Sequence, residues 1–144
     1  MLAKGDAAQK PRLRVVAAAM FDAAGCVLIA QRPEGKHMAG WWEFPGGKVG
    51  AGESDADALM RELREELGVE TRPLNEIMAL SHDYPDRTVD LVLLHTELLR
   101  GEPRGLDGQA LKWVDCQSLG NERLLPADAP FIGALQLLSS RAPA

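Results

Sequence analysis

The sequence predicts an α/β domain, because strand-like segments and two helix-like segments alternate along its 144 residues. The strand-like segments are short apolar runs bounded by turn residues, and the helix-like segments carry apolar residues at helical spacing. The 46% apolar and 26% charged residues are typical of a globular protein. We therefore expect one domain over residues 1–144, with tails at about 1–11 and 140–144.

The first strands are predicted to form a hairpin. Arg12–Phe21 should be a strand that becomes buried on both faces, and the turn 22–25 should lead into Cys26–Ala30 as its partner. A loop is expected over 31–40. Trp41 and Trp42 follow on a further strand and should point to opposite faces, so at most one enters the core while the other covers the surface or contacts a ligand.

A central helix should begin near Ser54, which can cap it, with Asp55 and Asp57 in its first turn. Gly68 should end this helix. The predicted buried stripe is Ala56, Leu59, Met60, Leu63 and Leu67.

The rest of the chain is predicted to hold three strands, two loops and a helix. In order, we expect an extended segment at 69–80 interrupted at Pro73, a polar loop at 81–87, a strand at 88–98, a loop at 101–108, a strand at 110–114 and a helix at 129–139 with Phe131, Leu135 and Leu138 in the core.

Composition excludes several classes of protein. Cys26 and Cys116, far apart in sequence, predict neither a disulfide framework nor a zinc site. No stretch approaches the roughly 18 apolar residues of a membrane span, and the first ten residues lack the apolar run of a signal peptide. We therefore expect a cytoplasmic protein. The net charge of −5 argues against binding a nucleic acid polymer, but a nucleotide can bind where metal ions and local cations offset its phosphates.

Glu62, Glu65 and Glu66 lie three and four positions apart, so they share one face of the central helix. Like charges at this spacing cost about 0.2 to 0.5 kcal/mol per pair in an isolated helix. A divalent cation such as Mg²⁺ would reverse the sign, because hard ions gather carboxylate oxygens. The alternative is a solvated charged face in which Arg61 pairs with Glu65.

The spacing of the surrounding residues is more specific. The fixed positions are Gly47, Glu53, Arg61, Glu62, Leu63, Glu65, Glu66, Gly68 and Val69. Glycine, five residues, Glu, seven residues and then Arg-Glu-apolar-x-Glu-Glu-x-Gly-apolar resembles the signature of the Nudix hydrolases at every fixed position. The resemblance implies an α/β/α sandwich with a mixed central sheet and hydrolysis of a nucleoside diphosphate linked to a further group.

The resemblance also implies roles for these residues. Mg²⁺, or Mn²⁺ in its place, would be held by Gly47 through its carbonyl together with Glu62, Glu65, Glu66 and Asp107. Glu62 is the first candidate for the general base, with Glu65 beside it, while Arg61 and Glu53 would hold the acids in place. Asp107 has the alternative of being a plain turn residue.

Other segments are similar to the MutT branch of the family, whose members hydrolyse oxidised purine triphosphates, chiefly 8-oxo-dGTP, to the monophosphate and pyrophosphate. These segments are 31–33, 36–40, 42–48, 84–87 and 125–128. The resemblance would place Arg32 and Lys48 near the phosphates, and Phe44, Arg87 and Asp128 around the base and sugar. In the simpler alternatives Arg32 is a surface residue, Phe44 is core, Arg87 pairs with Asp86 and Asp128 caps a helix.

Asp128 departs from the MutT pattern, which has Asn at this position. An ionised Asp only accepts hydrogen bonds, whereas Asn also donates them. Some relatives that hydrolyse CTP or modified dCTP carry a similar Pro-Ala-Asp run, so a pyrimidine triphosphate is the alternative substrate. A further alternative is a nucleotide sensor with a vestigial site, against which the intact acidic residues argue. The sequence leaves open whether the protein is a monomer or a homodimer.

Overall fold

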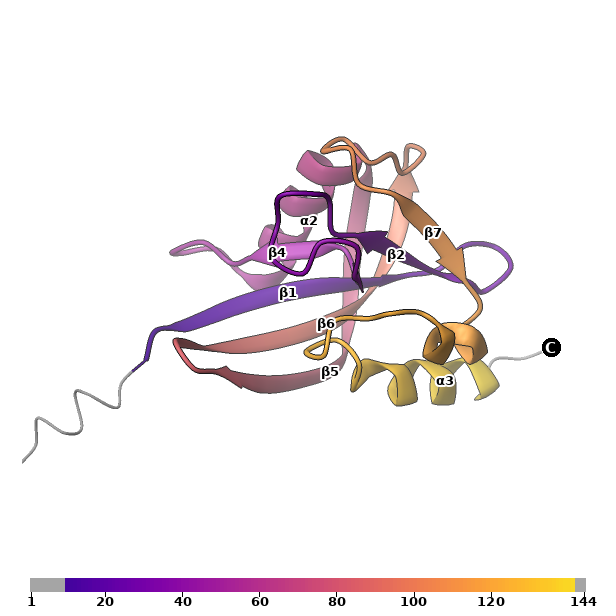
Figure 1. Cartoon of the computed structure of the whole chain (residues 1–144). Helices are drawn as coiled ribbons and strands as arrows, with labels where there is room; N and C mark the ends of the chain where they lie inside the picture. Colours follow the sequence, from indigo (N-terminus) through magenta and orange to yellow (C-terminus); the bar gives the residue numbers. More distant parts are fainter. Residues whose placement is uncertain (1–9, 142–144) are drawn as a thin grey trace, which may run out of the picture.

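The computed structural model describes residues 10–141, which form two β-sheets with helices on both faces of the larger sheet (Figure 1). The strands are β1 (Arg12–Met20), β2 (Val27–Gln31), β3 (Trp42–Glu43), β4 (Gly46–Lys48), β5 (Glu70–Tyr84), β6 (Arg87–Arg100) and β7 (Leu111–Val114). The helices are α2 (Asp55–Leu67), the 3₁₀ helix η1 (Cys116–Asn121) and α3 (Phe131–Arg141). None of the described helices is both long and apolar enough to span a membrane.

The larger sheet has the strand order β4-β1-β6-β5. Strands β1 and β6 are parallel, and the other pairs are antiparallel, so the sheet is mixed, as predicted. The smaller sheet has the order β3-β2-β7. In the larger sheet β4 pairs with β1 in the register Val16↔Gly47, which places the glycine-rich segment beside the middle of the central strand.

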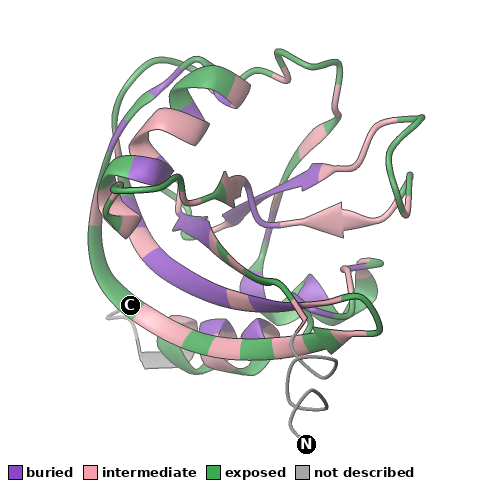
Figure 2. Cartoon of the chain, turned by 90° about the vertical axis from the view of Figure 1, so that its left-hand side faces the viewer, coloured by how far each residue is buried: buried purple, intermediate pink, exposed green. Residues whose placement is uncertain are grey.

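Two layers of core separate the larger sheet from its helices, with α2 above it and α3 below it in Figure 1. On the α2 side, Val16 and Met20 pack in one cluster with Leu63. On the α3 side, Ala17 joins a cluster that includes Phe131. The last five residues of β1 are therefore all buried, as predicted for a strand covered on both faces (Figure 2).

The predicted hairpin between β1 and β2 is wrong. The two strands do not pair: an isolated bridge joins Phe21, just past the end of β1, to Val27, and β2 pairs with β3 and β7. The reason is that β6 occupies one edge of β1 along its whole length, while on the other edge β4 pairs with 15–17 and the Ala18 N–H donates to the Pro45 carbonyl. Only the last two residues of β1 remain open on that edge, and the chain turns at Asp22 and starts a second sheet.

The predicted loop at 81–87 is also wrong, because β5 continues to Tyr84 and only a two-residue turn separates it from β6. The polar side chains of this segment bond across the hairpin. Ser81 Oγ donates to Asp90 Oδ1 at 2.6 Å, and Thr88 Oγ1 donates to Asp83 Oδ1 at 2.6 Å. Polarity there reflects an exposed strand face. The expected interruption near Pro73 is present as a register shift.

Helix α2 has the predicted ends. The Ser54 side chain accepts from the Asp57 N–H at 3.1 Å, and Gly68 adopts a left-handed φ of 71°. Its buried stripe contains Ala58 with three leucines, while the predicted Ala56 and Met60 are only half-buried. In α3, Phe131 and Leu135 are buried, but the predicted core residue Leu138 is 44% exposed, because the helix has only one face against the sheet.

Candidate active site

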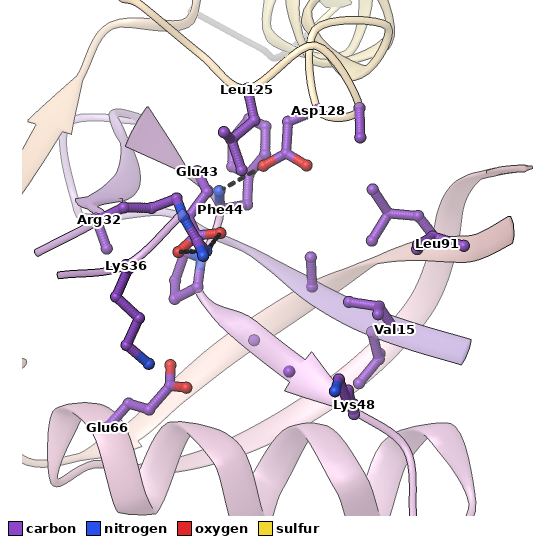
Figure 3. Close-up of a pocket in the computed structure, with 18 of the residues that line it drawn as sticks. Val15, Arg32, Lys36, Glu43, Phe44, Lys48, Glu66, Leu91, Leu125 and Asp128 are labelled. Atoms are coloured by element: carbon purple, nitrogen blue, oxygen red, sulfur yellow. Dashed lines mark hydrogen bonds and ion pairs between the residues drawn. The ribbon is translucent and has the colours of Figure 1, made fainter. Parts of the chain in front are cut away.

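A pocket of about 310 Å³ opens between β1, β4, α2 and the loops at 31–41 and 125–128 (Figure 3). Glu66 of α2 lies at one end, and the buried Asp128 lies at the other. Of the residues proposed from the sequence, the pocket lining includes Arg32, Phe44, Gly47, Lys48, Glu66, Arg87, Asp107 and Asp128. Segments distant in the sequence thus meet around one space.

Arg61 binds the acidic residues of the signature. Its Nε and Nη2 donate to the two carboxylate oxygens of Glu53, at 2.7 and 2.9 Å. Its Nη1 donates to Glu62 at 3.0 Å and to Glu65 at 3.3 Å, and Nη2 also donates to the Lys48 carbonyl at 3.1 Å. The bonds from Arg61, together with the Gly50 N–H, lower the pKa of Glu53 to about 2. Glu53 is therefore ionised and anchors Arg61.

Gly47 lies directly against Glu62. A Cβ at position 47 would overlap the Glu62 carboxyl group, so any larger residue would have to displace that group. The absence of a side chain therefore brings the Gly47 backbone next to a carboxylate of α2.

Glu66 is half-buried and lies close to Glu62 on the same face of α2. Burial, and then the neighbouring Glu62 carboxyl, raise the pKa of Glu66. Two crowded carboxyls of this kind are hard oxygen donors that a divalent cation would stabilise in the ionised form. Among residues 10–141, no group of three acidic, His or Cys side chains is close enough together to hold a metal ion. Glu65 pairs with Arg61, and Asp107 is exposed at the rim of the pocket.

At the other end, Asp128 is 5% exposed, and its Oδ2 accepts the Phe44 N–H at 3.0 Å. Burial raises the pKa of Asp128 to about 7, against the effect of this hydrogen bond. The Asp128 backbone carbonyl, rather than its side chain, accepts from Phe131 at the start of α3. Phe44 is both buried in the core and part of the pocket lining, with its ring 6.1 Å from that of Phe131.

The cationic side chains proposed to contact the substrate differ in the protein groups that they contact in this structure. Arg32 bonds to Glu43 and to the His37 carbonyl. Arg87 pairs with Asp86 at 3.1 Å, as in the simpler alternative, and lies 4.4 Å above the Tyr84 ring centroid. These two arginines therefore reach the pocket while held by protein groups. The exposed Lys48 also lines it.

The lining also includes Lys36, Glu43 and Tyr84, which the sequence did not single out as site residues. Burial raises the pKa of Glu43 despite its contact with Arg32. The only sequence signal for Lys36, Glu43 and Tyr84 as site residues was their position inside the segments similar to the MutT branch. The two tryptophans lie outside the pocket lining, with Trp42 packed against the core and Trp41 stacked beneath Arg123 at 4.2 Å.

These features define the class of protein. Residues 10–135 match the family model of the NUDIX domain, and the chain belongs to the Nudix family of hydrolases. It is 37% identical over 129 residues to a CTP pyrophosphohydrolase of Escherichia coli, covering 90% of this chain and 96% of the relative. It is 44% identical over 113 residues to a putative 8-oxo-dGTP diphosphatase 2 of Mycobacterium tuberculosis, covering 77% of this chain and 80% of the relative.

Solved structures agree with this assignment. The solution structure of the E. coli ORF135 protein matches with a TM-score of 0.80 and 35% identity, covering 94% of this chain and 96% of that one. A MutT protein from Methanosarcina mazei matches with a TM-score of 0.78 and 25% identity, covering 92% and 96%. The protein is therefore an enzyme with the Nudix α/β/α sandwich, as the sequence predicted.

Proposed function

We propose that this Nudix hydrolase is a metal-dependent nucleoside triphosphate pyrophosphohydrolase of the MutT type, acting in the cytoplasm to remove damaged nucleotides. The observation that carries the proposal is the pocket itself. It joins Glu66 of α2, next to which a phosphate chain and cations can meet, to a buried Asp128 that can hydrogen-bond a base, while Glu62 and Glu65 lie on the same helix outside the lining.

The side chains of Glu62, Glu65 and Glu66, with the Gly47 carbonyl, are the groups that would hold Mg²⁺ or Mn²⁺, and Asp107 is a further ligand candidate. When bound, such an ion neutralises charge on the phosphate oxygens and lowers the pKa of water. Glu62 is our candidate to accept the proton of the attacking water, because Arg61 fixes its carboxylate beside Gly47. Attack at the β-phosphorus would release the monophosphate and leave pyrophosphate.

For the substrate, 8-oxo-dGTP is the first candidate, consistent with the names of several relatives. Phe44 and Arg87 would contact the base and sugar beside Asp128. The second candidate is CTP or a modified dCTP. It is favoured by the Asp128 carboxylate, which can accept from the amino group of cytosine, and by the relative named CTP pyrophosphohydrolase.

The test is turnover of 8-oxo-dGTP, dGTP, CTP and dCTP with Mg²⁺, with Mn²⁺ and with chelator, and separation of pyrophosphate from orthophosphate. We expect metal-dependent pyrophosphate release with kcat/KM highest for 8-oxo-dGTP. Higher kcat/KM for CTP would select the second substrate. No turnover of any triphosphate would reject the proposal in favour of a nucleotide sensor.

A further inference from the structure

Arg32 and Lys36, two cationic residues of the loop between β2 and β3, line the pocket. Of these two, Arg32 is held by hydrogen bonds to other groups of the loop and of β3. Arg32 Nε donates to the His37 carbonyl at 2.6 Å, and Nη1 lies 3.1 and 3.2 Å from the two oxygens of Glu43. Its backbone N–H donates to the Trp41 carbonyl at 2.8 Å, and its own carbonyl accepts from Gly40 at 2.9 Å. Arg32 therefore closes the loop through both its backbone and its side chain.

The same loop is held in an unusual backbone conformation. Gly35 and Gly40 have φ of 89°, and Met38 has φ of 57°, which costs a non-glycine residue on the order of 1 kcal/mol. A loop fixed by Arg32 can maintain such a conformation. In this loop conformation Lys36, which lies between Gly35 and Met38, lines the pocket.

The Lys36 side chain lines the pocket, and its ammonium group points toward the Glu66 carboxylate and away from Asp128 (Figure 3). Within the described part of the chain this ammonium group makes no hydrogen bond or ion pair. Lys48 approaches the same end from β4, across the pocket from Lys36. The charge of Lys36 acts on the half-buried Glu43 carboxyl and opposes the rise in the pKa of that group, but without a hydrogen bond the ammonium group is a point charge suited to phosphate oxygens.

We propose that Lys36 binds the nucleotide at the phosphates beyond the α-phosphate, and that Arg32 is a positioning residue that holds the loop for it. This inference rests on the proposed function. With the base at Asp128 and the metal-binding carboxylates on α2, the phosphates farthest from the base lie next to Lys36. Lys36 would then contribute to the preference for a triphosphate over a monophosphate.

The test compares Lys36→Met with Lys36→Arg, and with Lys112→Met as a control on a lysine that pairs with Glu122 outside the pocket. The dissociation constants of α,β-imido-dGTP, α,β-imido-dCTP and the two monophosphates are measured by calorimetry with Mg²⁺. We expect Lys36→Met to weaken triphosphate binding roughly 10- to 100-fold, the range for losing a hydrogen bond to a charged group. Monophosphate binding should change less than about twofold.

Lys36→Arg should restore most of the triphosphate affinity, and Lys112→Met should behave as the wild type. An unchanged triphosphate affinity in Lys36→Met overturns the inference, as does an equal loss for mono- and triphosphates, which would indicate a structural effect. If the wild type hydrolyses triphosphates while Lys36→Met binds them normally, this inference fails and the proposed function stands. If the wild type neither binds nor hydrolyses triphosphates, both this inference and the proposed function fail.

The role of Arg32 is tested by a double-mutant cycle with Arg32→Met and Lys36→Met. If Arg32 acts through Lys36, the double variant binds the triphosphate analogue no more weakly than the worse single variant. Additive losses would mean that Arg32 contacts phosphate itself. Glu43→Gln, which weakens the hold on Arg32, replaces Arg32→Met in the cycle if that variant does not fold, with the same two outcomes.

Discussion

The Arg61 guanidinium meets the Glu53 carboxylate in a two-point contact, with N–O distances of 2.7 and 2.9 Å. This contact joins the loop after β4 to the face of α2 that carries the other acids. Because the third nitrogen of Arg61 reaches Glu62 and Glu65, the orientation of these two carboxylates depends on a residue that lies outside the pocket lining. Glu53 is therefore proposed to act by positioning.

Glu53→Gln should reduce kcat roughly tenfold or more with a smaller effect on KM. A neutral amide holds Arg61 less strongly than a carboxylate, so Arg61 shifts and the acids near it are misplaced. Steady-state kinetics with the preferred triphosphate measures this. Glu70→Gln, which weakens the exposed pair with Arg64, is the matched control and should leave both constants unchanged. Equal kcat in the two variants would contradict the positioning role.

Glu62→Gln should lower kcat by roughly 10² or more, the range for loss of a general base, while the free energy of unfolding changes little. Glu65→Gln and Glu66→Gln, assayed alongside, show whether this loss is specific to one carboxylate. Near-normal turnover of Glu62→Gln, with a large loss in Glu65→Gln, would move the base to Glu65.

Gly47→Ala should cost activity more than stability. The added methyl group meets the end of the flexible Glu62 side chain, which can rotate away, so the fold survives while the carboxylate leaves its place. We expect kcat to fall at least tenfold and the melting temperature to fall by only a few degrees. Gly52→Ala is a control at a glycine where an added Cβ would meet nothing within 4 Å, although its φ of 76° makes some loss of stability certain. A fully active Gly47→Ala enzyme would show that the close approach to Glu62 is not needed.

Local rules were sufficient for α2, where Ser54 and Gly68 mark the two ends and the spacing of the glutamates places them on one face. They failed for β2, whose pairing is decided by which edges of β1 are free, and that depends on β4 and β6 far along the chain. Polarity also misled at 81–87, since a strand with one solvated face looks like a loop in sequence.

The site shows the same division. The Arg61 contacts lie within one helix, the loop before it and the end of β4, and the resemblance to the Nudix signature was enough to suggest that Arg61 and Glu53 hold the acids. The pairing of Phe44 with Asp128 spans 84 positions, and that of Arg32 with Glu43 depends on the loop between them. Neither contact can be read from spacing. Because Glu43 and the His37 carbonyl already hold Arg32, Lys36 is the cation on that loop left to meet a ligand.

Asp128 should make the stability of the protein depend on pH. Its pKa is about 7 in the folded protein, compared with an ordinary value of 3.8, because the side chain is buried. Between these values the folded state keeps a proton that the unfolded state has lost, so stability is greatest at low pH and falls as the pH rises toward 7. From pH 5 to pH 8 this one group should lower the free energy of unfolding by roughly 2 to 3 kcal/mol.

Asp128→Asn isolates this effect, because the amide keeps an oxygen that can accept the Phe44 N–H but does not titrate. Urea unfolding of both proteins at pH 5 and pH 8 gives the comparison, with the other titrating groups cancelling between them. From pH 5 to pH 8, the free energy of unfolding of Asp128→Asn minus that of the wild type should increase by roughly 2 to 3 kcal/mol. A constant difference would mean that Asp128 has the same pKa in the folded and unfolded states, and that its burial is relieved by water.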